Sequence, residues 1–555
     1  MKPATPTVEE MNTRRSQMFP TLTDAQVARI APFGKEVSFD PGHILYEEGD
    51  YNVPFYVVLE GSIEVVHLRS GVEEPVAIEQ VHEFTGEADV LSDRRALVRG
   101  KITEPTRLLR VERSRLRHLV QTDQELSEVL MRAFILRRMG LLAGQQGDVI
   151  IIGSRHSADT LRLEEFLTRN GHPHSYVDVD VDKDVQSLLD GFHVGIDDVP
   201  VLVCRGERVL KNPTNAAVAE CLGFNTAIDI GIVRDVVVIG AGPAGLAAAV
   251  YAASEGLDVL VLESEAPGGQ AGSSSKIENY LGFPTGISGQ ALAMRALTQA
   301  EKFGARIAIT KSATRLECDT VPYRIGFDGD DAVWTRSVVI ASGAQYRKLG
   351  VPDLARFEGV GVYYGATFVE AQRCESEDVI VVGGGNSAGQ AAMYLSRSSS
   401  RVHIMVRGEG LSASMSRYLI RRIEETPNIT LHVRTRVVGL AGGDHLEEVT
   451  WVDDATGEHQ TAPIRHVFTM AGAKPNTEWL GGCLQLDDKG FVLTGGDLPK
   501  NLVFDTKSRP PYAFETSLPR VFAVGDVRSG SIKRVAAGVG EGSACIQIVH
   551  KVLAE

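Results

Sequence analysis

The feature that most constrains the fold is a glycine-rich turn that joins a strand to a helix within residues 235–264. The segment reads DVVVIGAGPAGLAAAVYAASEGLDVLVLES, in which a β-branched strand enters the turn and a second strand ends at Glu263. Gly240 permits the tight turn, Gly242 leaves room for a pyrophosphate, and Gly245 lets helix and strand pack closely. The helix N-terminus offers free N–H groups to phosphate, and Glu263 is placed to accept hydrogen bonds from ribose hydroxyls. The segment therefore predicts a dinucleotide-binding site.

A second unit of this kind occupies residues 378–407, which read DVIVVGGGNSAGQAAMYLSRSSSRVHIMVR. Gly383, Gly385 and Ala388 stand in the places of the three glycines of the first unit. Two dinucleotide sites in one chain predict electron transfer between bound cofactors, in which a nicotinamide gives hydride to a flavin. We therefore expect two Rossmann-like α/β domains in the C-terminal part of the chain.

The second unit also indicates which nicotinamide nucleotide it prefers. Its second strand ends at Arg407, with no acid at the tip, and Arg417 extends the same basic patch. An acid at this place holds the 2′-hydroxyl of NAD, whereas an arginine accommodates the 2′-phosphate of NADP. We expect NADPH. The alternative, which leaves NADH open, is that Arg407 is a solvated surface charge and Glu409 holds the ribose.

Length and charge narrow the class of protein. A chain of 555 residues exceeds a single core, so about two to four domains are expected. The net charge of -15 disfavours nucleic-acid partners, since phosphate binding draws on Lys and Arg. The first twenty residues contain no apolar core of signal-peptide length, and no segment approaches the ~20 apolar residues of a membrane helix. We therefore expect a cytoplasmic protein with no membrane partner.

The N-terminal part differs from the rest in its pattern of apolar and polar residues. Residues 37–68 alternate apolar and polar side chains between turn signals, which predicts antiparallel β structure. Residues 114–142 carry apolar side chains at helical spacing. Residues 147–225 then predict a small α/β unit, with a strand at 148–153, a helix at 159–171, a strand at 174–182 and a hairpin at 199–210.

Over residues 232–555 the sequence resembles the low-molecular-weight thioredoxin reductases. Beyond the two glycine turns, the resemblance rests on GGQAGSSSKIENYLGFP, VVIASGAQYRKLGVP, FTMAGAKPNT and PRVFAVGDVRSGSIKRVAAGVGEGSACIQI. It implies an FAD-dependent NADPH oxidoreductase that forms a homodimer. The residues that it implies for FAD are Gly240, Gly242, Pro243, Ala244, Gly245, Glu263, Gly269, Gln270, Asn279, Ala341, Ser342, Gly343, Gly525, Asp526, Arg534, Val535 and Ala536. Those expected for NADP are Gly383, Gly385, Asn386, Ser387, Ala388, Arg407 and Arg417.

One departure from this resemblance bears directly on function. The reductases carry a CxxC dithiol just before the second glycine turn, where this chain has Gly365 and Phe368. Cys374 is nearby but single, and it is either a buried structural residue or a partner for a cysteine of another chain. A dithiol is needed to take two electrons from a flavin and form a disulfide. We therefore assign no catalytic residue and expect no internal dithiol relay.

Several functions stay open at this point. Reduced FAD would serve an unidentified acceptor: a partner flavoprotein, an iron–sulfur protein, a quinone, a disulfide substrate or oxygen. The alternatives are a thioredoxin-disulfide reductase proper and a flavin-based or cyclic-nucleotide sensor with little turnover. A DNA-binding regulator is a further class, which the acidic balance disfavours.

Residues 32–136 resemble the cyclic-nucleotide-binding domains through FDPGHILYEEGD, FYVVLEGSIEV and FTGEADVLSDRRALVRG. The resemblance implies a β jelly roll in which Gly86 and Glu87 bind the ribose and Arg95, before Ala96, binds the cyclic phosphate. Arg94 is the alternate phosphate ligand. The loop from Glu87 to Arg95 is shorter than usual, so the other interpretation is a jelly roll with a purely structural role.

Residues 147–225 resemble a thioredoxin or glutaredoxin fold. Val199-Pro200 matches the cis-proline turn of that fold, whereas Ser154 and Ser157 stand where a CxxC would be. The unit is expected to be redox-inert, with His156 as a surface residue, and to dock the reductase part or a partner. The implied domains are 1–145 (cyclic-nucleotide-binding-like), 146–228 (thioredoxin-like), 229–347 and 478–555 (FAD), and 348–477 (NAD(P)H).

The six cysteines are scattered. None lies within three positions of another, which excludes a CxxC pair and a local metal knuckle anywhere in the chain. We expect all of them to be inert, buried small residues. They are Cys204, Cys221, Cys318, Cys374, Cys483 and Cys545.

Overall fold

The computed structural model describes residues 14–69, 72–86, 90–91, 94–143, 149–182, 194–195, 198–204, 208–225, 227–504 and 509–555. In the part of the chain that it describes, no helix is long and apolar enough to cross a membrane. The cytoplasmic location stays a prediction.

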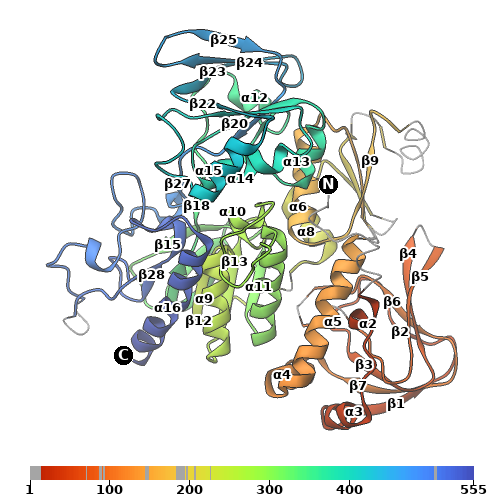
Figure 1. Cartoon of the computed structure of the whole chain (residues 1–555). Helices are drawn as coiled ribbons and strands as arrows, with labels where there is room; N and C mark the ends of the chain where they lie inside the picture. Colours follow the sequence, from red (N-terminus) through yellow and green to blue (C-terminus); the bar gives the residue numbers. More distant parts are fainter. Residues whose placement is uncertain are drawn as a thin grey trace.

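The N-terminal residues form a jelly-roll domain of two antiparallel sheets, with strand orders β1-β7-β3 and β2-β6-β4-β5 (Figure 1). Its core contains the rings of Phe55, Phe84 and Phe134, the last from the long helix α5. Edge-to-face contacts of this kind add to the apolar burial that holds helix against sheet. The strands are β1 (Gly34–Phe39), β2 (Ile44–Tyr46), β3 (Phe55–Glu60), β4 (Ile63–Arg69), β5 (Val72–Glu79), β6 (Arg99–Ile102) and β7 (Thr106–Val111). The helices are α2 (Arg15–Met18), α3 (Asp24–Ile30), η1 (Ala31–Phe33), α4 (Arg113–Thr122) and α5 (Gln124–Ala143).

A four-stranded sheet in the order β11-β10-β8-β9 forms the thioredoxin-like unit. β8 and β9 are parallel and the other pairs antiparallel. The Val199-Pro200 peptide bond is cis, as the resemblance implies. The helix predicted at 159–171 ends at Arg169, where Asn170 caps it. The elements are β8 (Val149–Gly153), α6 (Ala158–Arg169), β9 (Ser175–Asp178), β10 (Val201–Cys204), β11 (Arg208–Lys211) and α8 (Asn215–Leu222).

The first dinucleotide domain is built on a seven-stranded sheet in the order β14-β13-β12-β17-β16-β15, with β28 beside β17. β28 comes from the last part of the chain, so two distant segments share one sheet. Helix α16 packs on α9 so closely that a Cβ at Gly542 would lie 2.1 Å from the carbonyl oxygen of Ala244. The strands are β12 (Val233–Ile239), β13 (Val259–Glu263), β14 (Arg306–Ile309), β15 (Ala313–Glu317), β16 (Tyr323–Phe327), β17 (Ala332–Ile340) and β28 (Val521–Ala523). The helices are α9 (Pro243–Ser254), α10 (Gly269–Gly272), α11 (Gly289–Phe303), η4 (Glu478–Leu480), η5 (Gly495–Asp497), η6 (Gly525–Val527) and α16 (Val535–Ala554).

The second dinucleotide domain lies between these two segments of the chain. Its parallel sheet has the order β19-β26-β20-β21-β22, and a separate antiparallel sheet has the order β23-β24-β25. The short pair β18 (Ala344–Gln345) and β27 (Lys474–Pro475) connects it to the first domain. Its strands are β19 (Val362–Tyr363), β20 (Asp378–Val382), β21 (Arg401–Met405), β22 (Ile429–His432), β23 (Thr435–Ala441), β24 (Glu448–Asp453), β25 (His459–Ala462) and β26 (His466–Thr469). Its helices are α12 (Leu354–Phe357), α13 (Phe368–Arg373), α14 (Asn386–Leu395) and α15 (Arg417–Glu425).

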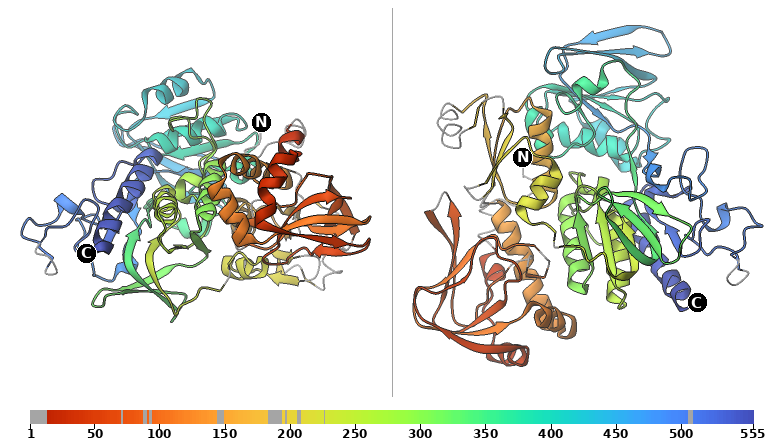
Figure 2. Two further views of the ribbon diagram at one scale, coloured as in Figure 1. Left: turned by 90° about the horizontal axis from the view of Figure 1, so that it is seen from below. Right: turned by 180° about the vertical axis from the view of Figure 1, so that it is seen from behind.

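The thioredoxin-like unit lies between the jelly-roll domain and the second dinucleotide domain in Figure 1 and in the right view of Figure 2. Helix α6 contacts α13, and Arg373 of α13 pairs with Glu164 of α6 at 3.1 Å. Asn225, at the end of the unit, exchanges two hydrogen bonds with the backbone of Ile309 in the first dinucleotide domain. The unit therefore bridges the other parts of the chain.

The prediction that all six cysteines are inert is wrong for two of them. Cys318, after β15, and Cys483, after η4, form a disulfide across a sequence separation of 165 residues. Sequence spacing did not reveal the pair because only the folded sheet brings the two loops together. The other four cysteines are free and buried, as expected: Cys204, Cys221, Cys374 and Cys545.

Candidate functional site

The first glycine turn lies where three parallel strands end. Ile239, Ile340 and Ala523 are level in neighbouring strands, so the segments that follow them meet at one edge of the sheet. A Cβ at Gly245 would lie 1.9 Å from the carbonyl oxygen of Gly240, which itself has φ +100. Both positions therefore require glycine for the helix to start against the strand.

Gly242 has a different role, because nothing crowds it. It caps the N-terminus of α9, and the nearest atom to its Cβ position is the Cα of Gly269, 4.0 Å away. Open space thus lies next to the unpaired N–H groups of a helix N-terminus, where the helix dipole favours an anion. The arrangement is a cradle for a diphosphate.

Glu263 ends β13 beside this cradle. Its Oε2 accepts a hydrogen bond from the Ala241 N–H at 2.6 Å, and its Oε1 accepts from Glu265 N–H at 2.9 Å and Ala266 N–H at 3.2 Å. Burial raises the pKa of the Glu263 carboxyl despite these donors. Each carboxylate oxygen has more than one lone pair, so the fixed side chain retains capacity for a ribose hydroxyl.

Other residues predicted for FAD follow the same strand ends. Gly525 donates its N–H to Glu541 at 2.7 Å, and burial raises the pKa of the Asp526 carboxyl. Ser342 donates to the carbonyl of Asn476 at 2.8 Å, where the two dinucleotide domains are connected. The rest lie nearby in sequence and fold: Pro243, Ala244, Ala341 and Gly343 line the turns, Arg534 caps α16, Val535 and Ala536 begin it, and Gln270 and Asn279 are exposed.

The second cradle repeats this geometry in the other domain. Gly383 has φ +143, and a Cβ there would lie 2.8 Å from the carbonyl oxygen of Met470. Gly385 caps α14 with no atom within 4 Å of its Cβ position. Ala388 is fully buried under the turn. The Asn386 side chain accepts a hydrogen bond from Ser416 N–H at 2.7 Å, and Ser387 hydrogen-bonds Tyr346 of the connection between domains.

Two exposed arginines flank this cradle. Arg407 follows β21 and Arg417 begins α15, and within the described residues neither side chain makes an ion pair or hydrogen bond. Glu409, the alternative ribose ligand, is 3.4 Å from Arg434. The cations that a 2′-phosphate needs are therefore available at the strand tip, while the competing acid already has a partner.

The segment predicted to correspond to the dithiol of the reductases lies at the start of α13. Phe368 is its first residue, and the Cβ position of Gly365 lies 3.6 Å from Glu370 Oε1 and 3.8 Å from Ser273. Glu370 is buried and hydrogen-bonds Glu165 of α6, so burial and this partner raise the pKa of Glu165 well above its usual value. Burial also raises the pKa of the Cys374 thiol, which therefore stays protonated and unreactive at neutral pH.

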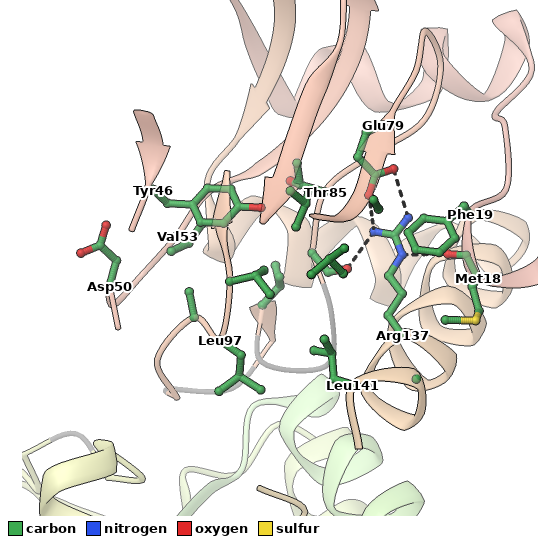
Figure 3. Close-up of a pocket in the computed structure, with 18 of the residues that line it drawn as sticks. Met18, Phe19, Tyr46, Asp50, Val53, Glu79, Thr85, Leu97, Arg137 and Leu141 are labelled. Carbon is green, nitrogen blue, oxygen red and sulfur yellow. Dashed lines mark hydrogen bonds and ion pairs between the residues drawn. The ribbon is translucent and has the colours of Figure 1, made fainter. Parts of the chain in front are cut away.

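A cavity of about 250 Å³ opens inside the jelly-roll domain (Figure 3). Arg137 points into it from α5 beside Glu79, with 3.4 Å between guanidinium and carboxylate, and donates to the Phe84 and Gly86 carbonyls at 2.8 and 2.9 Å. Burial raises the pKa of Glu79 to about 7. Apolar side chains form much of the remaining wall, including Val53, Leu97 and Leu141.

The cavity contains only some of the residues predicted for a cyclic nucleotide. Gly86, Arg94 and Ala96 line it, whereas Glu87 lies outside the described residues. Arg95 does not line it; its guanidinium lies 4.5 Å from the ring centroid of Tyr51 and against Gly223 of the thioredoxin-like unit. Sequence reasoning missed Arg137 and Glu79, because an arginine inside the apolar pattern of α5 gives no sign of which way it points.

Comparison with known proteins bears on both regions. A family model described as pyridine nucleotide-disulphide oxidoreductase matches residues 234–542. The chain belongs to this family. A second model, described as cyclic nucleotide-binding domain, matches residues 36–123.

The oxidoreductase part is similar to bacterial thioredoxin reductases. The enzyme of Mycolicibacterium smegmatis is 33% identical over 324 residues, which cover 58% of this chain and 97% of that protein. The enzyme of Treponema pallidum is 34% identical over 309 residues, 56% of this chain and 94% of that protein. The structure of Lactococcus lactis thioredoxin reductase has a TM-score of 0.52 at 30% identity, covering 58% of this chain and 99% of that chain.

This pyridine nucleotide-disulphide oxidoreductase is an FAD-dependent enzyme, and its cofactors are FAD and NADPH. The geometry fits both groups: each domain has an open helix N-terminus at a capping glycine, where a side chain would fill the space for a diphosphate. The first cradle adds a fixed acid at the strand tip, and the second adds two exposed arginines.

Proposed function

We propose that this chain is an NADPH oxidoreductase that delivers electrons from FAD to an external acceptor without an internal dithiol. The observation that carries the proposal is which residues occupy the segment where the reductases have their dithiol. Gly365 and Phe368 have no redox chemistry, and the one nearby thiol, Cys374, is buried and protonated.

In this proposal FAD, when bound, accepts hydride from NADPH and passes on two electrons. Gly240, Gly242 and Gly245 hold its diphosphate at α9, and Glu263 orients the adenosine ribose. Gly383, Gly385 and Ala388 hold NADPH at α14, with Arg407 and Arg417 at the 2′-phosphate. The remaining predicted residues, from Gly269 to Ala536, line the flavin. The protein supplies position and electrostatics while the cofactors supply the redox chemistry.

A thioredoxin-disulfide reductase proper is the second candidate, favoured by the relatives that bear this name. The Cys318–Cys483 disulfide does not substitute for the missing dithiol. β15 is the outermost strand of its sheet, three strands from β12, which is about 14 Å at the usual strand spacing.

A turnover assay distinguishes the two. With FAD and NADPH supplied, we expect reduction of small external acceptors, such as a quinone or ferricyanide, and no reduction of thioredoxin in a coupled assay. The double variant Gly365→Cys, Phe368→Cys serves as the matched control that restores the spacing of a dithiol. Thioredoxin reduction by the unmodified chain would overturn the proposal.

We further propose that the jelly-roll domain binds a cyclic nucleotide that regulates the oxidoreductase, and that the chain is a homodimer. The family match over residues 36–123 and the cavity beside Gly86 support the first part. Calorimetric titration with cAMP and cGMP tests binding. Light scattering coupled to size-exclusion chromatography measures the molar mass and so tests the dimer. A monomer, or a cavity that takes neither nucleotide, would refute the corresponding part.

A further inference from the structure

The C-terminal end of α6 is held by two arginines of the jelly-roll domain. Arg94 donates to the carbonyl oxygen of Asn170 at 2.9 Å, and Arg138 of α5 donates to that of Gly171 at 3.0 Å. The side chains of Arg94 and Arg138 are 7% and 4% exposed, so both bonds are shielded from water. Cations suit this position because the last carbonyls of a helix carry the negative end of its dipole.

The same turn also holds the first cradle. The Asn170 side chain donates to the carbonyl of Glu265 at 3.2 Å, and Arg169 pairs with the Glu265 carboxylate at 2.8 Å. Glu265 in turn donates its N–H to Glu263. Arg169 also reaches the carbonyl of Gly269, whose backbone lies beside Gly242 at the cradle. Only Asn170 and Glu265 therefore separate Arg94 from the acid at the strand tip.

Arg94 stands in the wall of two cavities at once. One is the 250 Å³ cavity of the jelly roll, and the other is a cavity of about 130 Å³ where the jelly roll, the thioredoxin-like unit and the first dinucleotide domain meet. Its guanidinium lies 5.1 Å from the ring centroid of Phe224, which lines the second cavity. Arg94 is thus engaged, in this structure, by the Asn170 carbonyl and the Phe224 ring.

We propose that Arg94 is a ligand-operated latch between the jelly-roll cavity and the FAD cradle. A cyclic nucleotide in the cavity presents a phosphate that competes with the Asn170 carbonyl for the Arg94 guanidinium. A phosphate wins this competition because a charge-assisted, forked bond is stronger than a bond to a neutral carbonyl. Loss of the Arg94 bond loosens the 166–172 turn, and with it the hold on Glu265 and the cradle. The latch rests on the nucleotide binding proposed above.

Hydrogen exchange on the full-length, FAD-loaded chain tests the latch. With saturating cAMP or cGMP we expect backbone amides of residues 166–172 to exchange at least ~5-fold faster, and FAD to dissociate faster from the loosened cradle. Arg94→Ala and the milder Arg94→Gln should show the faster exchange and faster FAD dissociation without nucleotide, and should not respond to it. Arg138→Ala, which breaks the other bond, should also loosen the turn but keep its response.

The outcomes separate the latch from the functions on which it rests. If calorimetry detects binding but exchange at 166–172 is unchanged, the latch is wrong while nucleotide binding stands. If neither nucleotide binds, both the latch and the proposed regulation fail. If NADPH never bleaches the flavin, the oxidoreductase proposal fails, and the exchange experiment still decides the latch. The Arg94 variants could also exchange faster throughout the chain, in step with a lowered melting temperature. That result would mean global unfolding and would overturn the latch.

Discussion

Gly242→Ala should abolish tight FAD binding and leave the fold intact. Gly242 has φ -69 and ψ 179, which alanine adopts freely, and its Cβ position is 4.0 Å from the nearest protein atom. Without cofactor, the change alters only cap and chain-entropy contributions, each below about 1 kcal/mol. The added methyl carbon instead fills the space next to the α9 N-terminus that the diphosphate requires.

The loss can be estimated from the bonds at stake. Displacing the diphosphate from one N–H group removes a charge-assisted hydrogen bond of roughly 1.5–3 kcal/mol. That corresponds to a roughly 10- to 150-fold weaker affinity for FAD. Quenching of flavin fluorescence during titration of the apoprotein measures the affinity, and scanning calorimetry of the apoprotein measures the fold.

Two matched variants make the result specific. Gly385→Ala occupies the equivalent capping position of α14, also with open space, so it should raise the KM for NADPH and leave FAD affinity unchanged. Gly245→Ala would place a Cβ 1.9 Å from the Gly240 carbonyl oxygen and should destabilise the domain itself. Unchanged FAD affinity in Gly242→Ala would refute the assignment of the first cradle.

Three further predictions concern other parts of the molecule. The double variant Cys318→Ser, Cys483→Ser opens a loop of 165 residues, so the free energy of unfolding of the first dinucleotide domain should fall by roughly 2–5 kcal/mol in chemical denaturation. An unchanged free energy of unfolding would show that the disulfide does not stabilise the domain. The raised pKa of Glu165 means that the unfolded chain ionises first as pH rises, so stability falls from about pH 4.5 upward through the folded-state pKa. Glu165→Gln should flatten this fall in melting scans from pH 5 to 8, whereas Glu164→Gln, which removes the carboxylate that pairs with Arg373, should lower stability without flattening the fall. Arg407→Ala should raise the KM for NADPH about 10-fold and leave that for NADH unchanged; equal effects on both would contradict the role given to its charge.

The sequence was most informative where function fixes the backbone. The two glycine turns were readable because a tight turn, an open helix N-terminus and a close helix–strand contact each require particular residues at fixed spacing. Gly240, Gly242 and Gly245 occupy just these environments, and the strands on either side are where the pattern placed them. The strands, the helix and the hairpin of the thioredoxin-like unit were also readable, whereas their order in the sheet was not predicted.

Contacts between distant segments were beyond the reach of the sequence. The Cys318–Cys483 disulfide joins loops that adjoin only once the sheet is built, and nothing local to either cysteine marks it. The directions of arginine side chains were equally hidden: Arg137 enters the jelly-roll cavity, while Arg95, expected there, lies against Tyr51. Long, flexible side chains take the direction that tertiary packing leaves open, which a one-dimensional pattern does not encode.

The central claim is that hydride passes from NADPH in the second cradle to FAD in the first. An anaerobic stopped-flow titration of the FAD-loaded chain with NADPH measures this transfer through the absorbance of the flavin. We expect the oxidised flavin band to bleach within seconds and to be exhausted at one NADPH per FAD. A chain that binds both cofactors, with a flavin band that NADPH leaves unchanged, would contradict the account.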